Sequence, residues 1–203
     1  FRSEYAVTDT VTTQCICKHI ATLMSLSEED KEKLDYAALL HDVGMLAISP
    51  KILDVPRALT QEETIKMRTH VNIAESVLKQ FLNPEIIDIA VAHHERSNGS
   101  GYYRGLTEEN MNIMQKILQV ADTVTAMVNP RSYRAARSKE NVINVLEDEA
   151  SHGRFNRSVV KTFSKNYDQI MKAVKKEADA ILLLHTKMNQ QYSLLYDNFN
   201  RDK

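Results

Sequence analysis

The stretch Ala37-Ala38-Leu39-Leu40-His41-Asp42-Val43-Gly44 runs through apolar residues and then sets an imidazole beside a carboxylate. Its apolar part has the pattern of a core helix, and Gly44 is a residue type on which helices commonly end. An ionisable pair that closes such a run is costly to bury unless other groups satisfy it. The stretch therefore predicts a core helix, at about residues 30–43, that brings two polar side chains into the interior.

Helical spacing of apolar residues continues through the rest of the chain, and glycine (5) and proline (4) are scarce. We therefore expect an all-α fold. Residue types that favour helix N-caps precede most of the periodic segments, at Ser27, Thr60, Asn83, Ser138 and Asn156. The further helices are expected at about 8–24, 61–80, 84–95, 112–128 and 139–149, followed by a long periodic stretch over 156–198. Residues 97–107 hold three glycines and are expected to form a shaped loop.

Composition limits the class of protein. The chain has 203 residues, of which 43% are hydrophobic, and this is enough to bury a core. Its 26 basic and 27 acidic residues leave a net charge of −1, so a broad basic face for duplex nucleic acid is not expected. No apolar run reaches the roughly 18 residues of a membrane span, so no membrane insertion is expected. Without a signal-peptide pattern, and with Cys15 and Cys17 interpreted as reduced thiols, we expect a cytoplasmic segment of a longer protein.

Further metal-type ligands interrupt other apolar helices. His93-His94 ends the run from Ile86 to Ala92, and Asp122 lies inside the run from Ile117 to Val124. Singly, each has an ordinary explanation as a hydrogen-bonded core histidine or a paired aspartate. One divalent-metal centre explains them together, and mixed imidazole and carboxylate ligands suit Fe, Mn, Zn or Co. The candidates exceed the four ligands of one tetrahedral site, so we expect two metal ions bridged by Asp42. The full candidate set is His41, Asp42, His70, His93, His94 and Asp122.

These residues resemble a known family. His41-Asp42 with the distant Asp122 resembles the HD superfamily of metal-dependent phosphohydrolases. The run from His93 to Tyr103 resembles the HHExxxGxGYP signature of HD-GYP domains, which are phosphodiesterases of the bacterial second messenger cyclic di-GMP. Arg131-Ser132-Tyr133-Arg134 is similar to the RPYR motif of that family. The resemblance covers about residues 9–163 and implies an HD-type helical bundle with a dinuclear metal centre.

The resemblance also implies roles for individual residues. One metal ion would be held by His41, Asp42 and Asp122, and the other by Asp42, His70, His93 and His94. Asp42 and Tyr102 are the expected catalytic residues, and Tyr102, Arg131 and Arg134 the expected substrate-binding residues. The implied reaction is hydrolysis of cyclic di-GMP to pGpG or GMP by a metal-bridging hydroxide. Fe or Mn is favoured, with Zn, Co or Ni as alternatives, and an N-terminal regulatory domain is an expected partner.

Several positions depart from the family pattern. Asp9 stands where the family has a histidine ligand, and an aspartate can also bind a hard metal ion. Met45 replaces the lysine of the HDxGK motif, which removes a phosphate-contacting charge, and Tyr103 replaces the proline of GYP. Tyr5 occupies the place of a glutamate associated with a third metal, so two metals are expected. The alternative function is therefore a catalytically weakened domain that acts as a receptor for cyclic di-GMP or another nucleotide.

The C-terminal stretch carries two apolar stripes. One repeats every seven residues, and the other follows four positions later; they are Tyr167, Val174, Ile181, Met188 and Leu195, and Met171, Ala178, His185, Tyr192 and Phe199. Such stripes are typical of a coiled-coil seam and also of a long helix packed on its own domain. We expect a phosphohydrolase domain at residues 1–163. Residues 164–203 are then an amphipathic helix that serves packing or homodimerisation.

Overall fold

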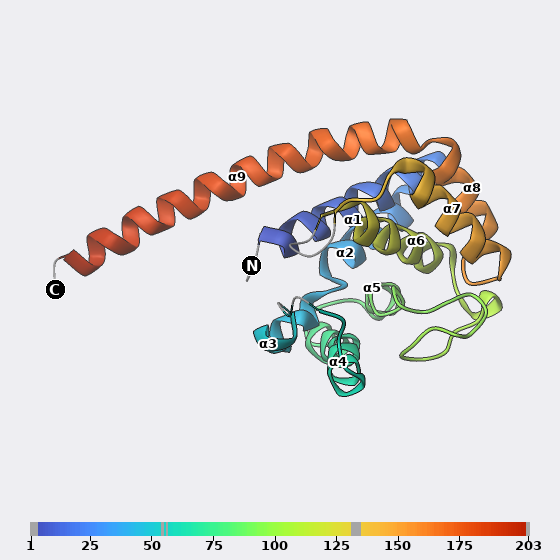
Figure 1. The fold of residues 1–203 in the computed structure, drawn as a ribbon, viewed down its shortest axis with the longest axis horizontal. Helices are drawn as coiled ribbons and strands as arrows, with labels where there is room; N and C mark the ends of the chain where they lie inside the picture. Colours follow the sequence, from blue (N-terminus) through green and yellow to red (C-terminus); the bar gives the residue numbers. More distant parts are fainter. Residues whose placement is uncertain (1–3, 54, 56, 131–134, 202–203) are drawn as a thin grey trace.

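The computed structural model describes residues 4–53, 55, 57–130 and 135–201, and within these residues the regular structure is helical, which confirms the all-α prediction. Figure 1 shows the elements in space. They are α1 (Glu4–Leu23), α2 (Glu28–Leu40), the 3-10 helix η1 (Val43–Ala47), α3 (Pro50–Leu53), α4 (Gln61–Leu78), α5 (Pro84–Ala90), the 3-10 helix η2 (Glu108–Asn110), α6 (Ile113–Val128), α7 (Lys139–Ser151), α8 (Arg157–Lys165) and α9 (Tyr167–Arg201).

Helix α1 lies at the centre of the bundle and packs against α2, α6 and α9 (Figure 1). Its residues Ile16 and Ile20 are fully buried, as are Ile117 and Val120 of α6. On the other side of the core, α2 packs on α5 and η1 packs on α4. The ends of α2 and α5 and the middle of α4 thereby meet in one region of the molecule.

The expected N-caps are confirmed, because each of their side chains accepts a hydrogen bond from a backbone N–H in the first turn of its helix. These residues are Ser27, Thr60, Asn83, Ser138 and Asn156. At Thr60 the arrangement is a reciprocal capping box with Glu63.

Helix α5 is shorter than expected, since it ends at Ala90 instead of continuing to about residue 95. The N–H of Ala92 bonds to the carbonyl of Ile89, an i to i−3 bond that tightens the chain into a turn. His93 and His94 therefore lie in a turn beyond the helix. Their rings can both face the same region, which neighbouring positions on a regular helix do not allow.

The long periodic stretch is interrupted at Asn166, where the sequence predicts no break. The N–H of Asn166 donates to the carbonyl of Phe163, and its side-chain amide donates to the carbonyl of Thr162 at 2.8 Å. These bonds satisfy carbonyls at the end of α8, so α9 begins anew at Tyr167. The domain boundary expected at residues 163/164 lies close to this break and stays a prediction.

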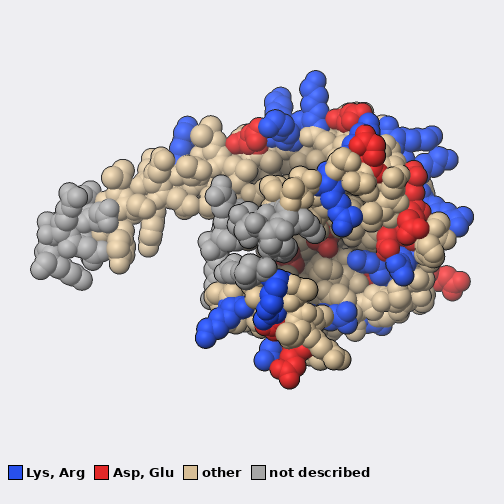
Figure 2. Space-filling model, viewed as in Figure 1, with Lys and Arg blue, Asp and Glu red and all other residues tan. Residues whose placement is uncertain are grey.

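Charge is distributed unevenly over the molecule. Figure 2 shows both signs over the visible face of the body and almost none on the part of α9 that projects from it. Within the described ranges, no helix is both long enough and apolar enough to cross a membrane.

Candidate metal centre

The side chains expected as metal ligands converge from four parts of the fold. His41 and Asp42 follow the last turn of α2, His70 lies in α4, His93 and His94 follow α5, and Asp122 lies in α6. The rings of His41, His70 and His93 are at most 1% exposed. Suitable nitrogen atoms of His70, His93 and His94 all lie within 4.8 Å of one another.

Three of the histidines are oriented in the same way. The Nδ1 atoms of His41, His70 and His93 each contact, at 2.7 Å, the carbonyl oxygen three residues earlier, which belongs to Ala38, Met67 and Ala90, respectively. A neutral ring donates its single proton in such a contact, so the Nε2 lone pair stays available. Metal-binding histidines are commonly fixed in this way by a second hydrogen bond.

The two Nε2 atoms of His70 and His93 lie 3.1 Å apart. Because both rings already donate through Nδ1, their neutral forms have no proton between the two Nε2 atoms. Two lone pairs that face each other at this distance repel unless a cation lies between them or a further proton is taken up.

The Asp42 carboxylate lies between two groups of histidines. Its Oδ2 is 3.2 Å from Nε2 of His41, whereas its Oδ1 is 3.5 Å from Nε2 of His70 and 3.6 Å from Nε2 of His93. Oδ1 is buried and has no hydrogen-bond partner among the described residues. A buried carboxylate oxygen without a donor is unusual in folded proteins, so a ligand at this position is favoured.

Asp122 completes the cluster from α6. One carboxylate oxygen lies 3.8 Å from Nε2 of His41, and the other lies 3.8 Å from Nδ1 of His94. Asp42 and Asp122 therefore both lie near Nε2 of His41.

Burial keeps two imidazoles of the cluster, those of His93 and His94, neutral. Burial, with the positive charge of His41, lowers the pKa of His93 to about 3. Burial also holds the pKa of His94 well below its usual value. Neutral imidazole is the form that binds a metal ion.

The pKa values of His41, Asp122 and Asp42 are shifted as well. Burial disfavours the charged form of His41, but the carboxylates of Asp42 and Asp122 outweigh it and raise its pKa to about 9. Burial raises the pKa of Asp122 to about 7. The Asp42 carboxyl, although burial opposes its ionisation, has a pKa well below the usual range because of the His41 charge. An ionised Asp42 carboxylate near the neutral imidazoles of His93 and His94 is a site for a cation.

These observations support a divalent metal centre. The available donors are imidazole nitrogens and carboxylate oxygens, which suit first-row transition metals. The orphaned Oδ1 of Asp42 and the facing lone pairs of His70 and His93 are both explained by a bound cation. The individual ligand roles remain predictions.

Tyr102 lies directly over the cluster. Its ring stacks on that of His94 with centroids 4.6 Å apart. The guanidinium of Arg68, a residue of α4, lies 4.7 Å from the centroid of the Tyr102 ring. Burial raises the pKa of the Tyr102 hydroxyl, so the phenol stays protonated. The mouth of the site therefore combines an aromatic face, a hydroxyl donor and a cation.

The glycine-rich loop is tied to the site by its backbone. A Cβ on Gly101 would lie 2.3 Å from the backbone nitrogen of Arg96, so only glycine fits there. The buried Glu95 carboxylate accepts hydrogen bonds from the backbone N–H groups of Arg104 and Leu106. Together these contacts hold Tyr102 above His94.

Tyr103 takes a backbone conformation that proline cannot adopt. Its φ is +99°, whereas a proline ring holds φ near −65°. Its hydroxyl donates a hydrogen bond to Glu75 of α4. A chain with the proline of the motif at this position could therefore not adopt this loop conformation.

The structure accounts for the other candidate cations. Arg104 pairs with Glu75 at 3.0 Å and with Asp88 at 2.9 Å, and Arg96 donates to the carbonyl of Glu95. Arg131 and Arg134, the expected substrate contacts, lie outside the described residues.

Arg68 was not expected from the sequence. It is exposed, and it forms no ion pair within the ranges that the structure describes. Its position two residues before His70 places it near the cluster in the sequence. The sequence of the helix does not show, however, that Arg68 contacts the loop that carries Tyr102.

Asp9, in α1, lies close enough to Asp122 for its charge to act on that carboxyl. Its Oδ1 accepts a hydrogen bond from the Asn129 side chain at 2.9 Å. Its charge contributes to the raised pKa of Asp122, although burial is the larger cause. Its expected role as a metal ligand remains a prediction.

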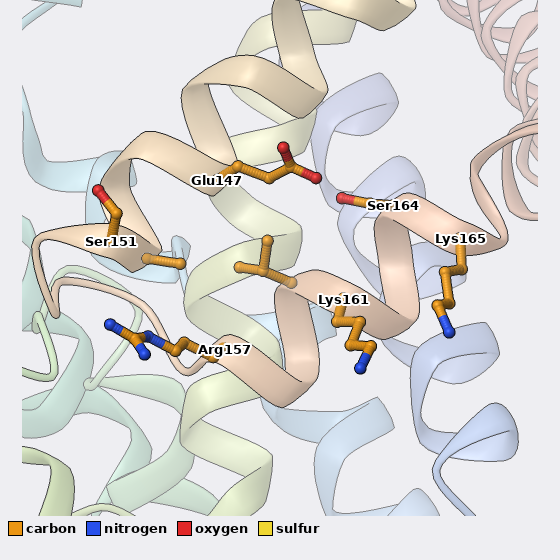
Figure 3. Close-up of a pocket in the computed structure, with 8 residues that line it drawn as sticks. Glu147, Ser151, Arg157, Lys161, Ser164 and Lys165 are labelled. Carbon is orange, nitrogen blue, oxygen red and sulfur yellow. The ribbon is translucent and has the colours of Figure 1, made fainter.

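A pocket of about 350 Å³ lies elsewhere, between α7 and α8. Figure 3 shows its lining, which includes Glu147, Arg157, Lys161 and Ser164. None of the expected site residues contributes to it, so it is separate from the metal cluster.

An all-α bundle in which buried histidines and partly buried aspartates converge on one point defines a class of metal-dependent hydrolytic domain. Residues 2–159 match the HD-domain family, and the chain belongs to that family. This confirms the family expected from the motifs, and the HD-domain family is metal-dependent.

Named relatives share this domain. The chain is 36% identical over 163 residues to a "Cyclic di-GMP phosphodiesterase" of Thermotoga maritima, covering 79% of this chain and 44% of the relative. It is 30% identical over 155 residues to "3'3'-cGAMP-specific phosphodiesterase 1" of Vibrio cholerae, covering 76% and 36%. The chain thus spans less than half the length of these two relatives.

A solved structure supports the fold. "Bd1817, a HDG"Y"P protein from Bdellovibrio bacteriovorus" superposes with a TM-score of 0.68 at 16% identity, covering 82% of this chain and 54% of that one. At this identity the likeness concerns the fold.

Proposed function

We propose that this chain is a metal-dependent phosphodiesterase domain that hydrolyses cyclic di-GMP to pGpG or GMP. The observation that carries the proposal is the cluster itself, in which Asp42 lies between His41 on one side and His70 with His93 on the other. Both relatives described above are named as phosphodiesterases of cyclic dinucleotides, which supports the same substrate class.

The residues present suit two metal ions that share Asp42. His70, His93 and His94 would hold one ion, and His41 with Asp122 the other. Ions bound there supply a nucleophile from water at neutral pH and neutralise phosphate charge. Fe or Mn is the proposed metal, since both accept imidazole and carboxylate ligands.

The chain's own groups orient the substrate. The Tyr102 hydroxyl can donate a hydrogen bond to a phosphate oxygen, and its ring is held parallel to His94. Arg68 supplies a positive charge beside this ring, in a chain whose Met45 has replaced the motif lysine. We propose that Arg68 contacts a substrate phosphate and takes over part of the role of that lysine.

The observation that favours the alternative function is Met45 itself. It is half-buried in η1, three residues after the Asp42 ligand position, and a thioether provides no positive charge for a phosphate. A domain that keeps its metals and its affinity but turns over slowly would act as a receptor for a cyclic dinucleotide.

The experiment is a turnover assay with separated products. The chain, reconstituted anaerobically with Fe or Mn, is incubated with cyclic di-GMP, 3'3'-cGAMP and linear pGpG, and the nucleotides are resolved by chromatography. The proposal expects metal-dependent loss of cyclic di-GMP and no activity in the His93→Ala variant. Tight binding of cyclic di-GMP without product would establish the receptor function instead.

We also propose that residues 164–203 act as an element distinct from the catalytic domain. The first half of α9 packs on α1, and its second half projects from the body (Figure 1). A contact with a second copy of the chain is the proposed use of the projecting half.

A further inference from the structure

The second half of α9 carries an exposed apolar stripe. Leu184, Met188, Tyr192 and Tyr196 are 58–68% exposed, and at 100° per residue they fall on one side of the helix. Every described side chain beyond His185 is exposed. Large contiguous apolar patches are uncommon on surfaces without a partner.

The stripe continues an interface that is already formed. Ile170, Val174 and Ala178 lie on the same side of α9 and are at most 7% exposed, because this part of the helix packs on α1. The contact is reinforced where Glu177 of α9 meets Lys18 and His19 of α1, both at 3.2 Å. Figure 1 shows α1 running beneath α9 in the opposite direction and starting near the middle of α9. Beyond that point the apolar side has lost its covering helix.

Charge does not oppose self-association there. Between residues 180 and 196 the sequence has a single charged side chain, Lys187, which lies on the side of the helix away from the stripe. The projecting surface in Figure 2 is accordingly almost free of charged residues.

We propose that the second half of α9 pairs with the same segment of a second copy of this chain, as an antiparallel two-helix contact. The position of α1 determines the direction. In a parallel pair, the first half of the partner helix would occupy the space that α1 already fills. In an antiparallel pair, the partner helix runs in the same direction as α1 and stops before the N-terminus of α1. It therefore does not overlap α1.

The register follows from the stripe. A two-fold axis on the stripe side of the helix, at the height of residue 190, sets Met188 of one copy against Tyr192 of the other, and Leu184 against Tyr196. Each aromatic ring then meets an aliphatic or thioether side chain, and contacts between sulfur and aromatic rings are favourable. Such an interface is self-complementary, as two-fold symmetry requires.

The available surface is adequate for a stable dimer. At 1.5 Å per residue, the segment from residue 184 to 201 is about 27 Å long. Specific interfaces bury about 800 Å² on each partner, and a helix of this length with an apolar stripe offers surface of that order.

The first test measures oligomeric state. Sedimentation equilibrium of the full chain is expected to give twice the chain mass of 23.2 kDa. The variant Met188→Glu/Tyr192→Glu should weaken self-association by about a hundredfold or more, because charges enter the contact. The matched control Gln190→Glu, on the opposite side of the same turns, should stay dimeric. Circular dichroism checks that all three proteins are folded, and hydrolysis of cyclic di-GMP should be equal in all.

The second test measures orientation by disulfide formation. A chain with Met188→Cys is mixed with one that carries Tyr192→Cys and is then oxidised mildly; the native Cys15 and Cys17 are buried and free. If the contact is antiparallel, disulfides should form between a Met188→Cys chain and a Tyr192→Cys chain. Disulfides only within each variant would show a parallel pair, and a monomer at all concentrations would show that something other than a second copy covers the stripe. Either result overturns the proposal.

Discussion

At the scale of single residues, the site depends on side chains whose types are visible in the sequence but whose partners are not. His41, His93 and Asp122 could be selected because each interrupts or ends an apolar helix, where an unsatisfied polar group is costly. Arg68 could not, since its contact with Tyr102 joins two residues that are distant in the chain. The sequence therefore predicts the metal ligands better than the groups that surround the substrate.

Arg68 leads to a prediction about substrate affinity. Replacing it in Arg68→Ala removes the positive charge beside Tyr102, and charged hydrogen bonds contribute roughly 1.5–3 kcal/mol. We expect KM for cyclic di-GMP to rise by about tenfold or more with a smaller change in kcat, and Arg68→Lys to recover part of the loss. The control Arg57→Ala removes an exposed guanidinium that contacts Glu63 and the Ala58 carbonyl. An unchanged KM in Arg68→Ala would remove Arg68 from the substrate site.

Met45 leads to a prediction about the rate of hydrolysis. If its replacement of the motif lysine slows turnover, then Met45→Lys should raise the rate of hydrolysis. Steady-state kinetics at equal metal content measure the effect. A rate that does not rise, with metal content unchanged, would show that the lost lysine is not what restrains this chain.

Cys15 provides a pH-dependent prediction that is independent of the metal cluster. Burial, with the nearby Glu177 carboxylate, raises its pKa to about 12 from a usual value of 9.0. Between these values the unfolded thiol loses its proton while the folded thiol keeps it. The free energy of unfolding should therefore fall as pH rises through this range. Urea denaturation at pH 8 and pH 10 measures the change, and Cys15→Ala should reduce the difference between the two.

At the scale of elements, the close approach of η1 to α4 brings Asp42 and His70 together. A Cβ on Gly44 would lie 1.9 Å from the carbonyl oxygen of His70 and 2.8 Å from the backbone nitrogen of Ala74. Neither backbone atom can move without shifting a helix. The fold therefore needs glycine at this position for packing, in addition to its expected role as a helix end.

The variant Gly44→Ala should accordingly separate the two halves of the cluster. We expect a loss of about 1–3 kcal/mol of stability, typical of overpacking, and a marked loss of bound metal. Thermal unfolding and metal analysis of the purified variant measure both. Ala47→Ser, at an exposed position of the same 3-10 helix, is the control and should change neither. Normal metal content in a folded Gly44→Ala protein would contradict the proposed role of this contact.

Element boundaries were predicted less well than element types. Residues 84–95 have the composition of one helix, yet the i to i−3 bond at Ala92 ends it early and turns both histidines towards the site. The break at Asn166 was also missed, because the sequence pattern predicts one periodic stretch over residues 156–198. In both cases a local hydrogen bond, which periodicity does not report, decides where the helix stops.

At the scale of the whole molecule, the chain consists of a body that contains the cluster and a helix that leaves it. Because every described side chain after His185 is exposed, a chain that ends at Thr186 should keep its thermal unfolding midpoint and its metal content. The same truncation should abolish self-association in sedimentation experiments. A large drop in the midpoint would mean that the projecting half of α9 stabilises the body.

The central claim is that the histidines and aspartates form a metal centre. The most direct test is metal content by plasma mass spectrometry, on protein purified without chelator. The account predicts two metal ions per chain, a clear loss in His70→Ala and His93→Ala, and no loss in the control His152→Ala, whose ring is exposed. A folded wild-type protein without bound metal, which also took up none from added Fe or Mn, would contradict it.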